Sequence, residues 1–380
     1  MRFSEIEHQQ RALSILKRAL CSGRTHHAYL FEGPPGVGKE LTARALAARL
    51  LCEAADLQPD ADACGACRSC HLLAAENHPD FHLIHRGLHK LHPDRSIRAS
   101  KGLFLAVDVI RHFLIEPATT SPALGRRRVF VIRDAERMNE GAQNALLKTL
   151  EEPPGSACLV LVSSSAERLL PTIRSRCQRI PFDLLPTDFV ARRLQELTRA
   201  DADAARTLAT LSQGSLGAAL HWHRLGLLDS LTQVAHLLAA DAQANPEQFA
   251  KALLEIAEEL ALRDLELSGS EDEEGAASRA RAKVDTDQMR QALKLTLMLI
   301  AAVCRDALVR CETSAAQRCL LPPDLPAPQR LARQPGTHLA DCIAAVADTE
   351  RLLDRNVAPQ LACERLAALL SPAAPAPARR

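Results

Sequence analysis

The chain has 380 residues, a length that predicts two or three domains at roughly 100–200 residues each. Hydrophobic residues make up 47% of it but aromatic residues only 3%, so its cores must consist mainly of Leu, Ala, Val and Ile, which favours helices and argues against an all-β sandwich. The 47 Lys and Arg residues balance 46 Asp and Glu residues, so net charge does not force binding to nucleic acid.

Short apolar runs alternate with helix-length segments in the first half of the chain. This alternation predicts a parallel sheet with helices on both faces, an α/β fold. Between two of the runs, Asn139 is a candidate N-cap for a helix that Pro153 and Pro154 end. The expected strands are 28–31, 81–84, 129–132 and 159–162, with a possible fifth at 179–182.

The strand pattern fades after Pro186, and amphipathic helical patterns rich in Ala and Leu continue to about residue 371. Residues 268–283 combine Gly, Ser and acidic residues and are expected to form a solvated insert. The predicted domains are an α/β core at 1–183, a small helical domain at 184–228, a larger helical domain at 229–371, and a disordered tail at 372–380.

The N-terminus carries charged residues where a signal peptide would need an apolar run. The longest apolar stretch, 293–304, is interrupted by Lys294 and Thr296 and is too short to span a membrane. We therefore expect a cytoplasmic protein whose 12 cysteines are reduced, and clustered cysteines in such a protein indicate metal binding.

A glycine-rich loop, GPPGVGK, follows the first expected strand and precedes a helical pattern. Glycines let backbone N–H groups converge on phosphate oxygens, and the lysine can neutralise terminal phosphates. The next residue should be a Ser or Thr that holds Mg²⁺, but it is Glu40, whose carboxylate would repel a triphosphate. The sequence thus predicts a degenerate P-loop and leaves ATP binding open. Its candidate phosphate-binding residues are Gly33, Gly36, Gly38 and Lys39.

Four cysteines form a second motif, three of them within CGACRSC. Their spacing lets the thiolates converge on one ion, and four thiolates suit a tetrahedral structural Zn²⁺, so we expect one zinc in a module at about 52–79. An iron–sulfur cluster is the chemical alternative. His71 or His78 could replace one ligand, although both are expected to be solvated, and the histidine-rich stretch 78–92 is expected to be a surface loop. The predicted ligands are Cys52, Cys64, Cys67 and Cys70.

These features together resemble the bacterial DNA polymerase III clamp-loader subunits, which belong to the AAA+ family. The resemblance covers most of the first 180 residues: HHAYLFEGPPGVGK, the cysteine array, NALLKTLEEPP at 144–154, and the triplet Ser175, Arg176 and Cys177. A shorter stretch, 356–366, is similar to the end of the family's collar domain. The three predicted domains would then be an AAA+ core with an embedded zinc module, a helical lid and an all-α collar.

Three positions depart from the family's ATP-hydrolysing subunits. Those subunits carry adjacent Asp and Glu where this chain has Arg133 and Asp134, so a cation replaces the acid that organises Mg²⁺. They also place a nucleotide-sensing arginine in the lid, where this chain has Gly217. Together with Glu40, these departures imply a member of the family without ATPase activity of its own.

The resemblance assigns a role to Arg176, which in the family crosses the subunit interface and stabilises charge on a neighbour's transferred phosphate. Such a finger in trans contributes about 10³–10⁵ in rate. The implied function is a stator in a heteropentamer with gamma/tau-type ATPase and delta subunits. Through the complex it would act on a sliding clamp and primed DNA, and no membrane partner is implied.

Two other functions remain open on the sequence alone. An ATP-hydrolysing subunit of the same family would bind ATP at residues 33–39 and turn it over by itself. A zinc-dependent nucleic-acid-binding module would show tight, strongly salt-dependent DNA binding, which the balanced charge argues against. A redox role for the cysteine pairs lacks a thioredoxin-like context.

Overall fold

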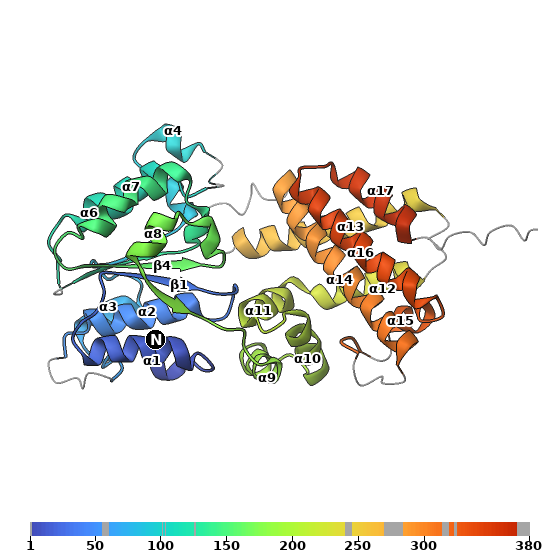
Figure 1. Cartoon of the computed structure of the whole chain (residues 1–380), viewed down its shortest axis with the longest axis horizontal. Helices are drawn as coiled ribbons and strands as arrows, with labels where there is room; N and C mark the ends of the chain where they lie inside the picture. Colours follow the sequence, from blue (N-terminus) through green and yellow to red (C-terminus); the bar gives the residue numbers. More distant parts are fainter. Residues whose placement is uncertain are drawn as a thin grey trace, which may run out of the picture. The chain divides into compact units, whose positions relative to one another are not determined.

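The computed structural model describes residues 2–54, 61–100, 102, 104–124, 127–239, 245–269, 284–313, 319–322 and 325–370. These residues form two compact units (Figure 1). The first comprises Met1–Pro186 with Gly214–Gly217, and the second comprises Thr187–Gln213 with Ala218–Arg380. The predicted tail and most of the predicted acidic insert lie outside the described residues.

All five predicted strands are present in the first unit and form one parallel sheet in the order β2-β3-β4-β1-β5. In the centre of the sheet, Leu30 of β1 lies between Leu161 of β4 and Arg179 of β5. The interior strands are buried along nearly their whole length, as a parallel sheet covered on both faces requires. The strands are β1 (Ala28–Glu32), β2 (Phe81–Ile84), β3 (Arg128–Ile132), β4 (Ala157–Ser163) and β5 (Gln178–Pro181).

Helices cover both faces of this sheet, which confirms the predicted α/β fold class (Figure 1). One face carries η1 (Phe3–Glu5), α1 (Gln10–Cys21), α2 (Lys39–Leu51) and α3 (Arg68–Ala74). The other segments of the unit are η2 (Arg86–Leu91), α4 (Arg95–Arg98), α5 (Val107–Ile110), the π-helical turn η3 (Arg111–Ile115), α6 (Glu116–Ala118), η4 (Ala135–Arg137), α7 (Glu140–Glu151), η5 (Ala166–Arg168) and α8 (Pro171–Arg176).

Helix α7 begins and ends as the sequence predicts. The Asn139 side chain accepts a hydrogen bond from the backbone N–H of Ala142, which satisfies one of the unpaired donors of the first turn. The helix stops at Glu151, just before the two prolines. Its apolar face packs into the core cluster through Leu146 and Leu150.

A buried ion pair near the start of two neighbouring strands was not expected from the sequence. Asp80 is fully buried and accepts hydrogen bonds from the backbone N–H groups of Ala123 (2.7 Å) and Leu124 (2.8 Å). The Arg128 guanidinium lies 3.5 Å from the same carboxylate and also donates to the carbonyls of Pro117 and Ser121. This arrangement holds the segment before β3 against the edge strand.

The histidine-rich stretch is not the surface loop that its spacing indicates. His78 and His92 are buried, and the residues between them include strand β2 and helix η2. Histidines are expected on a surface loop because they are polar, but here they belong to an edge strand. His82 of β2 stacks on Phe130 of β3, with ring centroids 4.8 Å apart. Polar aromatic rings can therefore replace aliphatic residues there.

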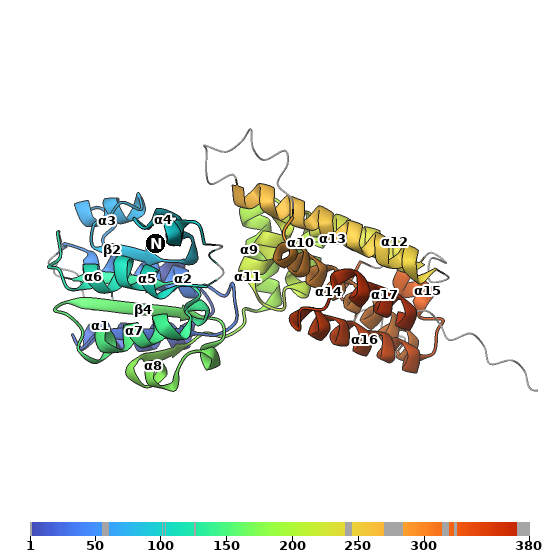
Figure 2. The same cartoon turned by 90° about the horizontal axis from the view of Figure 1, so that it is seen from above.

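The described part of the second unit contains helices and no strand (Figure 2). Helix α9 packs against α10, while α13 packs against α14 and α17, and α14 against α16. None of the helices in the described residues is both long enough and apolar enough to cross a membrane. The helices are α9 (Thr187–Thr198), α10 (Ala202–Leu211), α11 (Leu216–Leu225), α12 (Leu227–Ala239), α13 (Pro246–Gly269), α14 (Thr286–Glu312), α15 (Pro326–Leu331), α16 (Gly336–Asp354) and α17 (Pro359–Leu370).

Candidate functional site

The carboxyl ends of β1, β3 and β4 meet at one edge of the sheet, which is where open α/β folds bind their ligands. The glycine-rich loop follows β1 and leads directly into α2, whose N-cap Gly38 has a positive φ of 99°. Arg133 follows β3, and Ser164 follows β4. These segments line a pocket of about 300 Å³ together with Lys39 and Glu40.

Lys39 is directed onto its own loop. Its ammonium donates to the carbonyl oxygens of Gly33 (2.6 Å) and Pro34, and the residue is only 6% exposed. Burial lowers the pKa of Lys39 to about 8, although the nearby carboxylates of Glu136 and Asp134 oppose this shift. The lysine that would neutralise a triphosphate is thus held by loop carbonyls.

Glu40 forms an ion-pair network where the hydroxyl that holds Mg²⁺ would lie in an active P-loop. Its carboxylate accepts two hydrogen bonds of 2.7 Å from the Arg133 guanidinium and one of 3.1 Å from Arg44. Arg44 in turn pairs with Glu76, just beyond α3. Burial alone would raise the pKa of Glu40, but the hydrogen bonds and charge of Arg133 and the charge of Arg44 hold it below its ordinary value.

This network predicts a pH-dependent contribution to stability. The pKa of Glu40 is lower in the folded chain than its ordinary value of 4.5. The ionised Glu40 therefore stabilises the fold fully above pH 4.5, and this stabilisation is lost as the pH falls through the pKa of Glu40 in the folded chain. Glu40→Gln should therefore lower the free energy of unfolding at pH 7, and the difference from wild type should shrink below pH 4.5. Urea titrations across this range measure the difference. The exposed Glu140→Gln is the control, and a difference for Glu40→Gln that stays constant down to pH 3 would refute the prediction.

The residues after β4 are paired with a carboxylate. Ser164 donates to the Glu136 carboxylate from its backbone N–H (3.2 Å) and from its hydroxyl. Burial would raise the pKa of Glu136, but these hydrogen bonds from Ser164 hold it below its ordinary value. Ser163 accepts a hydrogen bond from the backbone N–H of Ser165. Both serines therefore have partners within the protein.

Gly217, at the position that the resemblance assigns to the lid arginine, lies directly on the glycine-rich loop. Its backbone N–H donates to the carbonyl of Gly36 (2.9 Å), and the Ser215 hydroxyl donates to the carbonyl of Pro35 (2.9 Å). A Cβ atom at position 217 would lie 2.8 Å from the Cα of Gly36, so a side chain there would force the two segments apart. The contact requires glycine.

The triplet Ser175, Arg176 and Cys177 lies at the end of α8, outside this pocket. Arg176 is partly exposed; its guanidinium donates to the Thr172 carbonyl (3.0 Å) and pairs with Glu151 (2.6 Å). The Ser175 hydroxyl donates to the same Thr172 carbonyl. Burial raises the pKa of Cys177 to about 12, so its thiol is a neutral core group.

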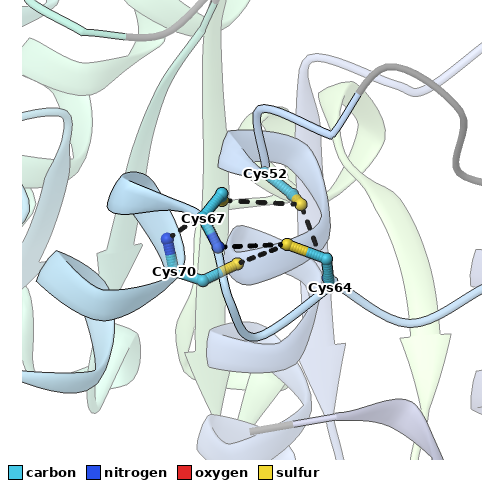
Figure 3. Close-up of side chains that lie close together, drawn as sticks. All are labelled: Cys52, Cys64, Cys67 and Cys70. Atoms are coloured by element: carbon cyan, nitrogen blue, oxygen red, sulfur yellow. Dashed lines mark hydrogen bonds between the residues drawn. The ribbon is translucent and has the colours of Figure 1, made fainter.

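The four predicted cysteine ligands come together. Their sulfur atoms all lie within 4.8 Å of one another, and Cys52–Cys67 and Cys64–Cys70 are each 3.9 Å apart (Figure 3). Four sulfurs bound at about 2.3 Å to one tetrahedral ion would lie roughly 3.8 Å apart. The geometry therefore fits a single metal ion, whereas a cluster of several irons would hold the sulfurs farther apart.

Backbone N–H groups stabilise negative charge in this cluster. Cys64 accepts hydrogen bonds from the N–H groups of Ala66 (3.4 Å) and Cys67 (3.3 Å), and these lower the pKa of its thiol to about 6. Burial raises the pKa values of Cys52 and Cys70. A metal ion must therefore displace the protons of the buried thiols, and the preformed donors favour thiolate at Cys64.

Neither candidate histidine belongs to the cluster. His71 is exposed on α3. His78 is buried, and its Nδ1 accepts a hydrogen bond from the Asp80 N–H (3.0 Å), so its proton resides on Nε2 and is donated to Ser69 (2.7 Å). Ser69 then donates to the carbonyl of Leu51 (2.6 Å), and burial lowers the pKa of His78. His78 is thus neither a ligand nor solvated as expected; it holds Ser69, whose hydroxyl joins α3 to the end of α2.

The parallel sheet and the loop after β1 define a P-loop protein of the α/β class. The family described as DNA polymerase III, delta subunit, matches residues 8–186, just under half of the chain, so this part of the chain is similar to that family. The resemblance found in the motifs is thereby confirmed.

Curated relatives agree with this assignment. The DNA polymerase III subunit delta' of Pseudomonas aeruginosa is 38% identical over 228 residues, which are 58% of this chain and 64% of that protein. The subunit delta' of Escherichia coli is 36% identical over 52% of this chain and 55% of that protein. The subunit gamma/tau of Mycobacterium bovis is 38% identical over 48% of this chain and 29% of that protein. The match thus spans less than two thirds of each relative.

Among solved structures, a DNA polymerase III gamma-subunit-related protein from Thermotoga maritima covers 95% of this chain and 98% of its own, with 20% identity and a TM-score of 0.39. The DNA clamp loader delta protein of Bacillus subtilis covers 94% of this chain and 99% of its own, with 13% identity and a TM-score of 0.32.

Proposed function

We propose that the chain is a delta' subunit, the non-hydrolysing stator of a DNA polymerase III clamp loader. In this role it packs beside gamma/tau-type and delta subunits in a heteropentamer and supplies Arg176 to a neighbouring ATP site. The complex then places a sliding clamp on primed DNA. The family match over residues 8–186 and the delta' relatives support this proposal.

One observation carries the non-hydrolysing part of the proposal. The bidentate pair between Arg133 and Glu40 puts a fixed cation where an active P-loop ATPase needs an acid to organise Mg²⁺. Lys39 is already bonded to loop carbonyls, and Gly217 lies on the loop. A bound triphosphate would therefore have to disturb three sets of contacts: the Arg133–Glu40 pair, the bonds of Lys39 and the contact of Gly217. We infer that the pocket contributes rigidity in place of hydrolysis.

The position of Arg176 supports the proposal that it acts on a neighbouring subunit, since it lies away from this pocket and about a third of its side chain is exposed. An arginine is suited to this role because its planar guanidinium stays charged and binds phosphate oxygens with several donors. The domain boundaries at 183 and 228 belong to the same proposal, with the helices from α9 onward forming a lid and then a collar that holds the subunits together.

Reconstitution tests the proposal. The chain alone is expected to show no ATP turnover, and adding it to the candidate ATPase subunits with delta, clamp and primed DNA is expected to raise their turnover. Turnover of order 1 per second by the isolated chain would support an ATP-hydrolysing subunit instead. Equal turnover with and without the chain would refute the proposed stator role.

A further inference from the structure

Helix α7 holds the segment that carries Arg176 at two points. In its first turn, the buried Gln143 accepts a hydrogen bond from the Leu170 N–H (2.8 Å) and donates to the Met138 carbonyl (3.1 Å). At its last residue, the Glu151 carboxylate lies 2.6 Å from the Arg176 guanidinium. The start and the end of α8 are thus both bonded to the same helix.

The guanidinium of Arg176 has two fixed partners on different elements. One amino group donates to the Thr172 carbonyl of its own helix, and the other pairs with Glu151 of α7. Two bonds in different directions define the plane of the guanidinium. Arg176 is 34% exposed and Glu151 is 48% exposed, so the pair is accessible, and no other described contact uses the remaining N–H groups of Arg176.

A long arginine side chain that acts across an interface must give up its rotamer freedom before it can stabilise charge. We propose that Glu151 is a positioning residue for Arg176, and that its carboxylate fixes the guanidinium before a neighbouring triphosphate is engaged. This inference rests on the proposed function and adds a residue that the sequence motifs did not single out. A preorganised donor stabilises a transition state more than a free one does, because less order must be created as the reaction proceeds.

The test compares Glu151→Ala, Glu151→Gln and Glu152→Ala in a reconstituted clamp loader whose other ATP sites are silenced. Glu152 is the matched control, because it is the adjacent exposed glutamate and has no ion pair among the described residues. Glu151→Ala is expected to lower kcat about three- to tenfold with KM for ATP unchanged. Glu151→Gln keeps an acceptor oxygen and should stay within about twofold of wild type, as should Glu152→Ala.

A double variant separates positioning from a structural role. In an Arg176→Ala background, Glu151→Ala should lower kcat no further, since there is no guanidinium left to orient. The positioning role of Glu151 would be overturned if Glu151→Ala lowered kcat as much in the Arg176→Ala background as in the wild-type background. It would also be overturned if Glu151→Ala alone left kcat unchanged or raised it. Neither result would contradict the proposed role of Arg176. If Arg176→Ala itself leaves turnover unchanged, the proposed function fails and this inference fails with it.

Discussion

In a reconstituted clamp loader carrying Arg176→Ala, we expect ATP turnover at the adjacent subunit's site to fall about 10³–10⁵-fold. The physical reason is that the transferred phosphoryl group gains charge on its equatorial oxygens, and a guanidinium inserted from a neighbour compensates this charge in a site that excludes water. Single-turnover hydrolysis, with the other ATP sites silenced, measures the effect on this site alone.

Assembly should survive this substitution, because the described contacts of Arg176 are confined to Thr172 and Glu151. Arg179→Ala is the matched control. Arg179 is a nearby exposed arginine, but its guanidinium is engaged by both carboxylate oxygens of Glu32, so its loss should leave turnover within about twofold of wild type. Unchanged turnover in an intact Arg176→Ala complex, or an equal loss in both variants, would contradict the assignment of the finger.

Local sequence signals predicted the features that depend on local chemistry. The strands follow from short apolar runs because every central strand of a doubly covered parallel sheet is buried on both faces. Three of the four clustered cysteines follow from two-residue spacing, since thiolates at that spacing can reach a common point. Helix α7 follows from Asn139 and the prolines, which act within a few residues of themselves.

Long-range pairings could not be predicted in this way. Asp80 and Arg128 are 48 residues apart, and nothing local shows that the carboxylate also caps the backbone at Ala123 and Leu124. The contact between Gly217 and Gly36 likewise joins segments that only the fold brings together. The sequence motif places Glu151 in a helix, but its pairing with Arg176 depends on how α7 packs against α8.

The pocket beside the glycine-rich loop and the cysteine module are linked by the same ion pairs. From Arg133 the network passes through Glu40 and Arg44 to Glu76, which follows α3 of the cysteine module. The ion-pair network at the pocket therefore also fixes the module against α2. The module needs such support, because the apolar cluster among its described residues is small: Ala48, Ala63, Cys70 and Leu73 are buried in it, and Phe81 packs against them.

The second large effect is expected at the metal centre. Metal analysis of the wild-type chain should return one zinc per chain, and Cys67→Ser should lose it, because a hydroxyl is a much poorer ligand than a thiolate. Structural zinc sites contribute about 10–16 kcal/mol of binding free energy in isolated finger peptides, part of which is folding free energy. The variant should therefore lose hydrogen-exchange protection across α3 and show a lower Tm, whereas the parallel sheet should remain protected.

Cys21→Ser is the control for this experiment, since Cys21 is exposed on α1 and does not belong to the cluster. It should keep the metal and the protection of α3. Zinc retained in full by Cys67→Ser would show that the four sulfurs are not the ligands, and iron with visible absorption in the wild-type chain would replace the zinc assignment. A chelator should reproduce the Cys67→Ser phenotype in the wild-type chain, because the small apolar cluster of the module cannot hold α3 in place once no ion joins the four sulfurs.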